Sequence, residues 1–239
     1  MTDRLNPTLT SRAALALAAV LMSSAAVPTL ARDDMDQALR AIEQQWDRAM
    51  YQTPASGKDA AFGRLDAAAA SLAEQYPGRA EPLIWEAISL SSHAGVAGGL
   101  SALGMAKDAR DLLLEAERMD ADALDGSVYT SLGALYGKVP GWPVGFGDKA
   151  KAERYLKRAL AINPSGIDPN YLYGDFLFDQ GRYREAERVL DRASHAPPRP
   201  DRPLADEGRR QEVRALLDQV RAKLADAGQG AAHGNARGG

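Results

Sequence analysis

Two segments of this chain carry the same pattern of small and large apolar residues, at a fixed interval of roughly 34 residues. Segment 151–164 reads KAERYLKRALAINP, and segment 185–198 reads EAERVLDRASHAPP. The shared positions are Ala152, Leu156, Ala159 and Pro164 in the first segment, and Ala186, Leu190, Ala193 and Pro198 in the second. Residues at i, i+4 and i+7 lie on one face of a helix, and a proline ends it. A fixed period of this length predicts stacked helical units.

A glycine lies in the apolar stripe of each helix that precedes these segments. Segment 129–136 reads YTSLGALY with Gly133 in its middle, and segment 170–177 reads NYLYGDFL with Gly174 in the same place. Glycine in a helix interior costs about 1 kcal/mol relative to alanine, so a close helix contact must recover this free energy. We therefore expect each of these helices to pack tightly against the helix that follows it.

These residues resemble the tetratricopeptide repeat, a helix-turn-helix unit of about 34 residues. The last copy fills the characteristic positions of that family with Tyr173, Gly174, Leu177, Gly181, Tyr183, Ala186, Leu190, Ala193 and Pro198. It departs at Asn170, where the family prefers tryptophan or another large apolar residue. The resemblance implies an all-α, right-handed helical solenoid of the tetratricopeptide type.

Two more helix pairs are predicted upstream of these copies. Ala87 and then Ala109, Leu113 and Ala116 repeat the spacing, and a degenerate first pair begins with the stripe Met35, Leu39, Ile42, Trp46 and Ala49. We thus expect about four helix pairs over residues 32–198. A Pro-rich link and a C-terminal capping helix are expected over 199–227, followed by a disordered tail over 228–239.

Two copies are lengthened between their helices, by SSHAGVAGGLSALG at 91–104 and by a segment at 137–148. Because a longer connection costs entropy without adding core, we expect two loops on one edge of the solenoid that form a contact patch or the rim of a pocket. Trp142 and Phe146 supply apolar area there. The alternative is that these two rings plug the solenoid's own groove.

The concave groove is a second candidate binding surface. The positions that face the groove in the family correspond to Tyr171, Asp175 and Phe178, which predicts an aromatic and acidic surface. Asp175 and Asp179 are interpreted as a solvated helix face. His93 is the only histidine outside the Pro-rich link and the tail, so the sequence predicts no metal site, no cofactor and no catalytic residue, and His93 is either structural or part of the contact patch.

The N-terminal residues have the pattern of a secretory signal peptide. Arg4 and Arg12 precede the uncharged run AALALAAVLM, and small residues follow, so cleavage is expected after Ala31, with cleavage after Ala26 as the alternative. Without residues 1–31 the chain has 27 basic and 31 acidic residues, a net charge of −4 that argues against nucleic-acid partners. The chain has no cysteine that could carry a lipid anchor. We therefore expect a periplasmic or secreted protein without a stable membrane anchor.

Residues 80–225 also resemble a group of periplasmic tetratricopeptide proteins that includes the T component associated with TRAP transporters. This resemblance implies a non-enzymatic protein that docks onto a solute-binding protein, forms homo-oligomers and passes a small hydrophobic ligand. Two functions are therefore predicted. The first is a protein-interaction module that uses its groove and its two long inter-helix loops. The alternative is an accessory subunit of a solute uptake system that binds a small hydrophobic ligand.

Overall fold

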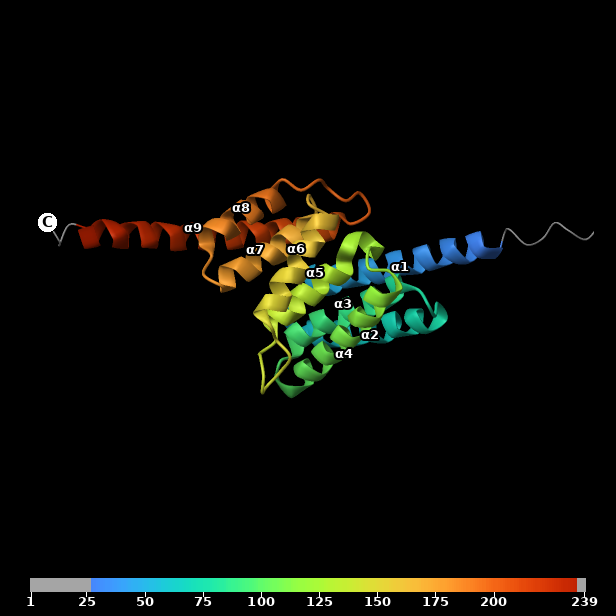
Figure 1. Cartoon of the computed structure of the whole chain (residues 1–239). Coiled ribbons are helices and arrows are strands. Elements are labelled where there is room, and N and C mark those ends of the chain that lie inside the picture. Colours follow the sequence, from blue (N-terminus) through green and yellow to red (C-terminus); the bar gives the residue numbers. More distant parts are fainter. Residues whose placement is uncertain (1–26, 236–239) are drawn as a thin grey trace, which may run out of the picture. The chain divides into compact units, whose positions relative to one another are not determined.

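The computed structural model describes the backbone of residues 27–235 and the side chains of residues 32–227. Its helices are shown in Figure 1: α1 (Val27–Tyr51), α2 (Ala55–Gln75), α3 (Ala80–Ala97), α4 (Gly99–Met119), α5 (Ala123–Lys138), α6 (Lys149–Ile162), α7 (Ile167–Asp179), α8 (Tyr183–Ser194) and α9 (Pro203–Asn235). The predicted signal peptide lies outside the described residues, apart from its last five residues, which begin α1. The contacts divide the chain into residues 1–36 and 37–239, and the packing below concerns the second unit.

Consecutive helices pack as hairpins, and each hairpin packs on the next. Figure 1 shows α3 beside α4, α5 beside α6, and α7 beside α8, while α2 also packs on α3 and α8 on α9. The prediction of an all-α tetratricopeptide solenoid with four helix pairs and a further C-terminal helix is confirmed. No strand occurs within residues 27–235. No helix in this range is both long enough and apolar enough to span a membrane.

The repeated small residues lie where the two helices of a pair touch. A Cβ atom at Gly133 would lie 2.5 Å from Cγ of Leu156, and one at Gly174 would lie 2.5 Å from Cγ of Leu190. Both leucines are fully buried. The predicted close packing of the helix pairs is therefore confirmed, and it explains why glycine is used in these helix interiors.

Asn170, which departs from the family pattern, ties the last repeat together with hydrogen bonds. Its side chain is fully buried, and its Nδ2 donates to the carbonyl oxygens of Pro164 (2.9 Å) and Gly166 (2.8 Å). Its Oδ1 accepts from Nε of Arg192 on α8 at 3.2 Å. A buried polar side chain is tolerated when its hydrogen bonds are made, so these contacts replace the expected apolar packing.

The prediction of a loop over residues 91–104 is wrong. Helix α3 continues to Ala97 and α4 begins at Gly99, so only Gly98 separates them. Gly98 and Gly99 both have positive φ, which glycine adopts readily, and together they make the turn. The extra residues lengthen both helices because eight of the fourteen residues at 91–104 are alanine, leucine or serine, which a helix accepts at modest cost.

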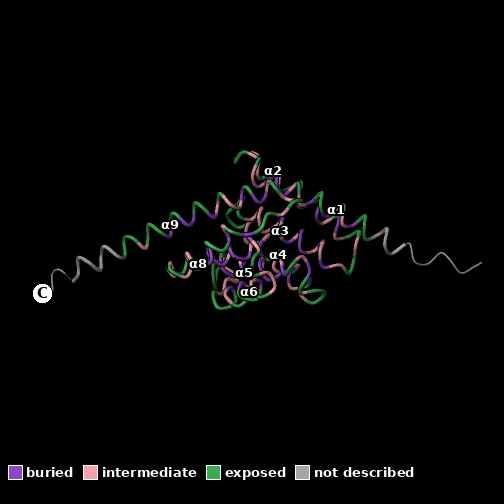
Figure 2. Tube along the Cα trace, turned by 90° about the horizontal axis from the view of Figure 1, so that it is seen from above, coloured by how far each residue is buried: buried purple, intermediate pink, exposed green. Residues whose placement is uncertain are grey.

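Helix α9 is longer than the predicted capping helix. It packs on α8, buries Val213, Leu216, Leu217 and Val220, and continues to Asn235. The backbone of residues 228–235, part of the segment predicted to be a disordered tail, continues this helix. Figure 2 shows buried and exposed residues alternating along the first part of α9.

Candidate functional site

The segment between α5 and α6, residues 139–148, is a loop held by its own backbone. Gly147 N donates to the carbonyl oxygen of Pro140 (2.9 Å), and Asp148 N donates to that of Tyr136 (3.0 Å). The Asp148 carboxylate caps α6 by accepting from Lys151 N at 2.9 Å. A Cβ atom at Gly147 would overlap the carbonyl oxygen of Val139, so the closed form of this loop requires glycine there.

The two aromatic side chains of this loop have different environments. The Phe146 ring packs edge-on against Tyr136, with centroids 5.5 Å apart, and the Arg110 guanidinium lies 4.5 Å from its centroid. The Trp142 side chain, in contrast, is 90% exposed, and Val144 is 64% exposed. Phe146 therefore anchors the loop, and the alternative in which Trp142 plugs the groove is wrong.

The loop lies beside the start of α4, as Figure 1 shows. A Cβ atom at Gly145 would lie 3.3 Å from Cδ1 of Leu103, so these two segments touch. Leu100, one helical turn before Leu103, is 90% exposed. We call Leu100, Trp142 and Val144 the edge patch. The predicted proximity of segments 91–104 and 137–148 is confirmed, although only the second is a loop.

The concave groove contains a cavity of about 310 Å³. Side chains from α1, α3, α5 and α7 line it, and its apolar wall includes Trp46, Trp85, Ile88 and Leu172. The rings of Trp46 and Trp85 meet edge to face, with centroids 6.5 Å apart, and Trp46 Nε1 donates to Oγ of Ser92 at 2.9 Å. The volume is at the lower end of the range for small-molecule sites.

The chain's own C-terminal region closes this groove. We call residues 199–212 the strap. The Arg202 guanidinium forms an ion pair with the Asp47 carboxylate on α1 and lies 5.1 Å from the ring centroid of Trp85. A Cβ atom at Gly208 would overlap the Tyr51 ring, so α9 lies directly against the end of α1. The groove predicted to be a candidate binding surface is thus bridged by the strap.

Asp168 at the start of α7 is the centre of the strap's ion pairs. Its two carboxylate oxygens accept from Nη1 of Arg199 and Nε of Arg209, each at 2.7 Å. Burial alone would raise the pKa of Asp168, but the charges of Arg209, Arg199 and Arg202 outweigh it and lower that pKa to about 2. Arg199 also pairs with Asp206 at 2.7 Å. The strap is therefore held by charges that persist through the neutral pH range.

The three groove residues predicted from the family pattern do not line the cavity. The Tyr171 ring lies 4.5 Å below the Arg209 guanidinium. Asp175 pairs with Lys138 Nζ at 2.7 Å, and Asp179 pairs with the same nitrogen, so these two carboxylates share one lysine instead of forming a solvated face. Phe178 packs on Tyr183 with ring centroids 5.5 Å apart.

His93 joins α3 to α2. Its Nδ1 lies 2.6 Å from Oδ2 of Asp66, its Nε2 lies 3.2 Å from Oδ1 of Asp59, and its ring stacks on Phe62. Ser89 Oγ donates to the other oxygen of Asp66, so this serine is not activated by the histidine. His93 thus has the contacts of a structural residue that connects two helices. Among the described residues, no cluster of three or more ligand side chains is suited to a metal ion.

The contacts of His93 predict a pH-dependent stability. Burial would lower the pKa of His93, but its hydrogen bonds to Asp66 and Asp59 raise it above 6.5. The raised pKa means that this stabilisation is complete below the unfolded pKa and is lost as the pH rises through the folded pKa. We expect the difference in melting temperature between the wild type and His93→Gln to be largest near pH 5.5 and to shrink toward pH 8.5. A constant difference across this range would contradict the assignment.

The comparisons with known proteins agree with the repeat fold. Residues 144–203 match the tetratricopeptide repeat family. No curated protein sequence matches this chain. A thermophilic TPR protein from Thermus thermophilus, TTC0263, superposes with a TM-score of 0.52 at 18% identity, covering 80% of this chain and 94% of its own. MamA superposes with a TM-score of 0.42 at 17% identity, covering 71% of this chain and 92% of its own. PilF of Pseudomonas aeruginosa superposes with a TM-score of 0.34 at 17% identity, covering 81% of this chain and 93% of its own.

Proposed function

We propose that this chain is a non-enzymatic tetratricopeptide protein that binds a protein partner through the edge patch. The observation that carries the proposal is the position of Trp142, a large aromatic side chain that is 90% exposed on a loop fixed by backbone hydrogen bonds. Tryptophan is enriched among residues that dominate binding energy at protein interfaces. A rigid support lowers the entropy lost when such a side chain is immobilised on binding.

The shape of the edge patch favours a macromolecular partner over a small molecule. Leu100, Trp142 and Val144 are three of the four large apolar side chains that are exposed in the described part of the chain. Small-molecule sites are concave and enclose most of their ligand, whereas this patch projects from a loop and a helix start. A projecting apolar group suits a pocket on another protein.

Export is part of this proposal. It is supported by the charged start, the uncharged run at residues 13–22 and the small residues that follow, and the absence of cysteine is compatible with an oxidising compartment. The partner would then be a periplasmic or secreted protein. A periplasmic solute-binding protein is the first candidate, because the resemblance to TRAP-associated proteins implies one.

Replacement of Trp142 by alanine tests the edge patch. We expect Trp142→Ala to weaken partner binding by about 2 kcal/mol, roughly thirtyfold in Kd, because the main apolar anchor is removed. The melting temperature should stay unchanged because Trp142 is exposed. The partner is captured from periplasmic extract with the wild type and identified, and Kd is then measured for both chains. Met119→Ala, which shortens the fourth exposed apolar side chain, is the matched control and should bind like the wild type. Equal affinity of Trp142→Ala and wild type for this partner would refute the proposal.

The cavity supports a second candidate function, an accessory subunit of solute uptake that binds a small hydrophobic ligand. Trp46 and Trp85 both line the cavity, and the chain has three tryptophans in total. In Trp142→Ala the two remaining tryptophans therefore report on the cavity alone. A change in their fluorescence on titration with small apolar carboxylates, together with self-association in light scattering, would favour this function. An unchanged spectrum would argue against it.

A further inference from the structure

A second groove lies on the opposite side of α5 from the cavity. Tyr129 and Tyr136, one face of α5, form its floor, and side chains of α4 and α6 form its walls. The cavity contacts the other face of α5 through residues such as Thr130 and Ala134. This second groove has a volume of about 700 Å³, and we call it the tyrosine groove.

Aromatic rings form a continuous row along the tyrosine groove. Tyr155 stacks between Tyr129 and Tyr136, with centroid distances of 6.0 and 5.7 Å, and Tyr136 contacts Phe146 edge-on at 5.5 Å. The geometry of this row is fixed by packing, because Tyr129 and Tyr136 are almost fully buried, so the rings form a rigid support for the side chains above them.

Three cations of α6 line the tyrosine groove, and two of them lie over the rings of this row. Lys151 Nζ lies 5.2 Å from the centroid of Tyr136, Arg158 Cζ lies 4.8 Å from that of Tyr129, and Arg154 also lines the groove. All three side chains are exposed. Within the described part of the chain, none of them forms an ion pair with a carboxylate, and the groove lining contains one acidic side chain, Glu117. A local positive charge thus persists on a chain whose formal net charge is −3.

The geometry points to an acidic peptide segment of a partner protein as the ligand of the tyrosine groove, and we propose this assignment. From Lys151 to Arg158 the helix rises about 10 Å, which matches about three to four residues of extended peptide. Carboxylates of such a peptide would pair with Lys151, Arg154 and Arg158, while its apolar side chains would contact Leu114 and Tyr155, the partly exposed apolar residues of the lining. Stacking on the rings holds two of the cations in place, which reduces the entropy lost when the peptide binds.

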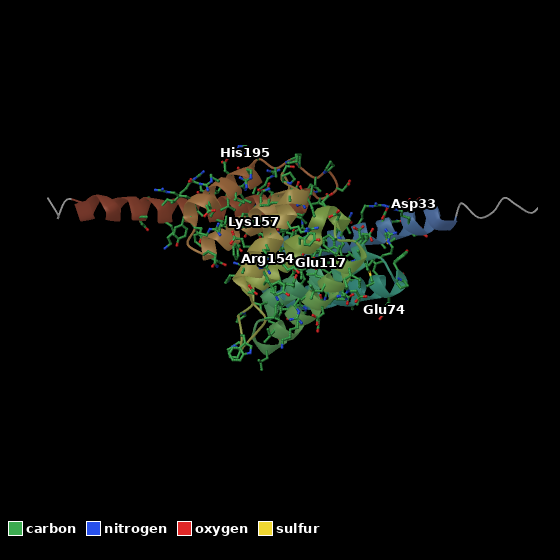
Figure 3. All side chains as sticks on the ribbon, in the orientation of Figure 1. Asp33, Glu74, Glu117, Arg154, Lys157 and His195 are labelled. Atoms are coloured by element: carbon green, nitrogen blue, oxygen red, sulfur yellow. The ribbon has the colours of Figure 1, made fainter. Side chains whose placement is uncertain are left out.

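A matched control residue is present on the same helix. Lys157 is exposed like Arg158 but pairs with Glu153 at 2.9 Å and does not line the tyrosine groove. Figure 3 labels Arg154 and Lys157 on α6 and Glu117 on α4. Removing the charge of Lys157 therefore changes the net charge of α6 without changing the groove.

The test is fluorescence anisotropy with two labelled peptides, one in which glutamate alternates with leucine and one in which glutamine replaces glutamate. We expect the glutamate peptide to bind roughly tenfold more tightly or better, and its affinity to fall as salt is added. The double variant Arg154→Gln, Arg158→Gln should abolish this preference, and Lys157→Gln should retain it. Trp142→Ala should also retain it, which separates this site from the edge patch.

Several outcomes would overturn the proposal. If the wild type bound the two peptides with equal affinity, the proposal would be overturned. It would also be overturned if Lys157→Gln lost as much affinity for the glutamate peptide as the double variant does. An oligonucleotide of matched charge that binds as tightly as the glutamate peptide, and is lost in the same double variant, would show a general polyanion site instead of a peptide site. The melting temperature of the double variant, expected to match the wild type, confirms that the fold is intact.

Discussion

Gly174→Leu is expected to lower the free energy of unfolding by about 3 kcal/mol, at the upper end of the usual cost of overpacking a core. A Cβ atom alone at this position would lie 2.5 Å from Cγ and 2.6 Å from Cδ2 of Leu190, and both residues are buried between α7 and α8. The helices must separate to admit any side chain. Urea unfolding followed by circular dichroism at the helical signal measures the loss.

Gly95→Leu is the matched control. Gly95 is also a helical glycine, but a Cβ atom there would have no neighbour within 4 Å. Leucine is favoured over glycine in a helix by several tenths of a kcal/mol, so this variant should be as stable as the wild type or slightly more stable. If both variants unfolded at the same urea concentration, the close contact between α7 and α8 would be disproved.

Asp168→Asn is expected to destabilise the protein by about 3 kcal/mol, because it leaves the Arg199 and Arg209 guanidinium groups without their shared carboxylate. Both guanidinium groups are largely shielded from water, with side-chain exposures of 34% and 13%. The strap should loosen, and the groove should become more accessible. Thermal unfolding measures the stability, and quenching of Trp46 and Trp85 fluorescence by acrylamide in the Trp142→Ala background measures the accessibility.

The same substitution changes the acid sensitivity of the fold. The pKa of Asp168 is lowered in the folded state to about 2, so the stability that it contributes is present above the unfolded pKa near 3.8 and is lost as the pH falls toward 2. The difference between the wild type and Asp168→Asn should therefore diminish over this interval. Asp201→Asn removes an exposed carboxylate of the strap that makes no ion pair within the described residues, and it should behave as the wild type does.

The helical repeat could be predicted from the sequence because its determinants are local and periodic. Ala152, Leu156 and Ala159 occur at helical spacing, and the glycines at 133 and 174 indicate directly which helix face packs against the second helix of the pair. The prediction of a loop at 91–104 is wrong for a related reason. Several glycines suggest irregular backbone, but only Gly98 and Gly99 adopt positive φ, while Gly95 and Gly104 lie within helices.

The closed groove could not be predicted from local patterns. Trp46, Trp85 and the strap come together from distant segments, and the ion-paired Asp47 and Arg202 are 155 residues apart. A Pro-rich link is ordinarily only a spacer. The overlooked signal is the set of arginines at 199, 202 and 209, alternating with Asp201 and Asp206. The exposure of the aromatic rings could not be predicted from the sequence either, because Trp142 and Phe146 share one loop but only Phe146 packs against the helices.

The strap gives this solenoid a cooperativity that a simple repeat array lacks. In stacked repeats each unit touches only its neighbours, so terminal units can unfold alone. Here the ion pair between Arg202 and Asp47 spans 155 residues, and Gly208 packs on Tyr51, so neither end of residues 37–212 can open without the other. This contact also raises the contact order, which slows folding. During synthesis the strap leaves the ribosome after residues 37–198, so the earlier helix pairs can form before the strap crosses the groove.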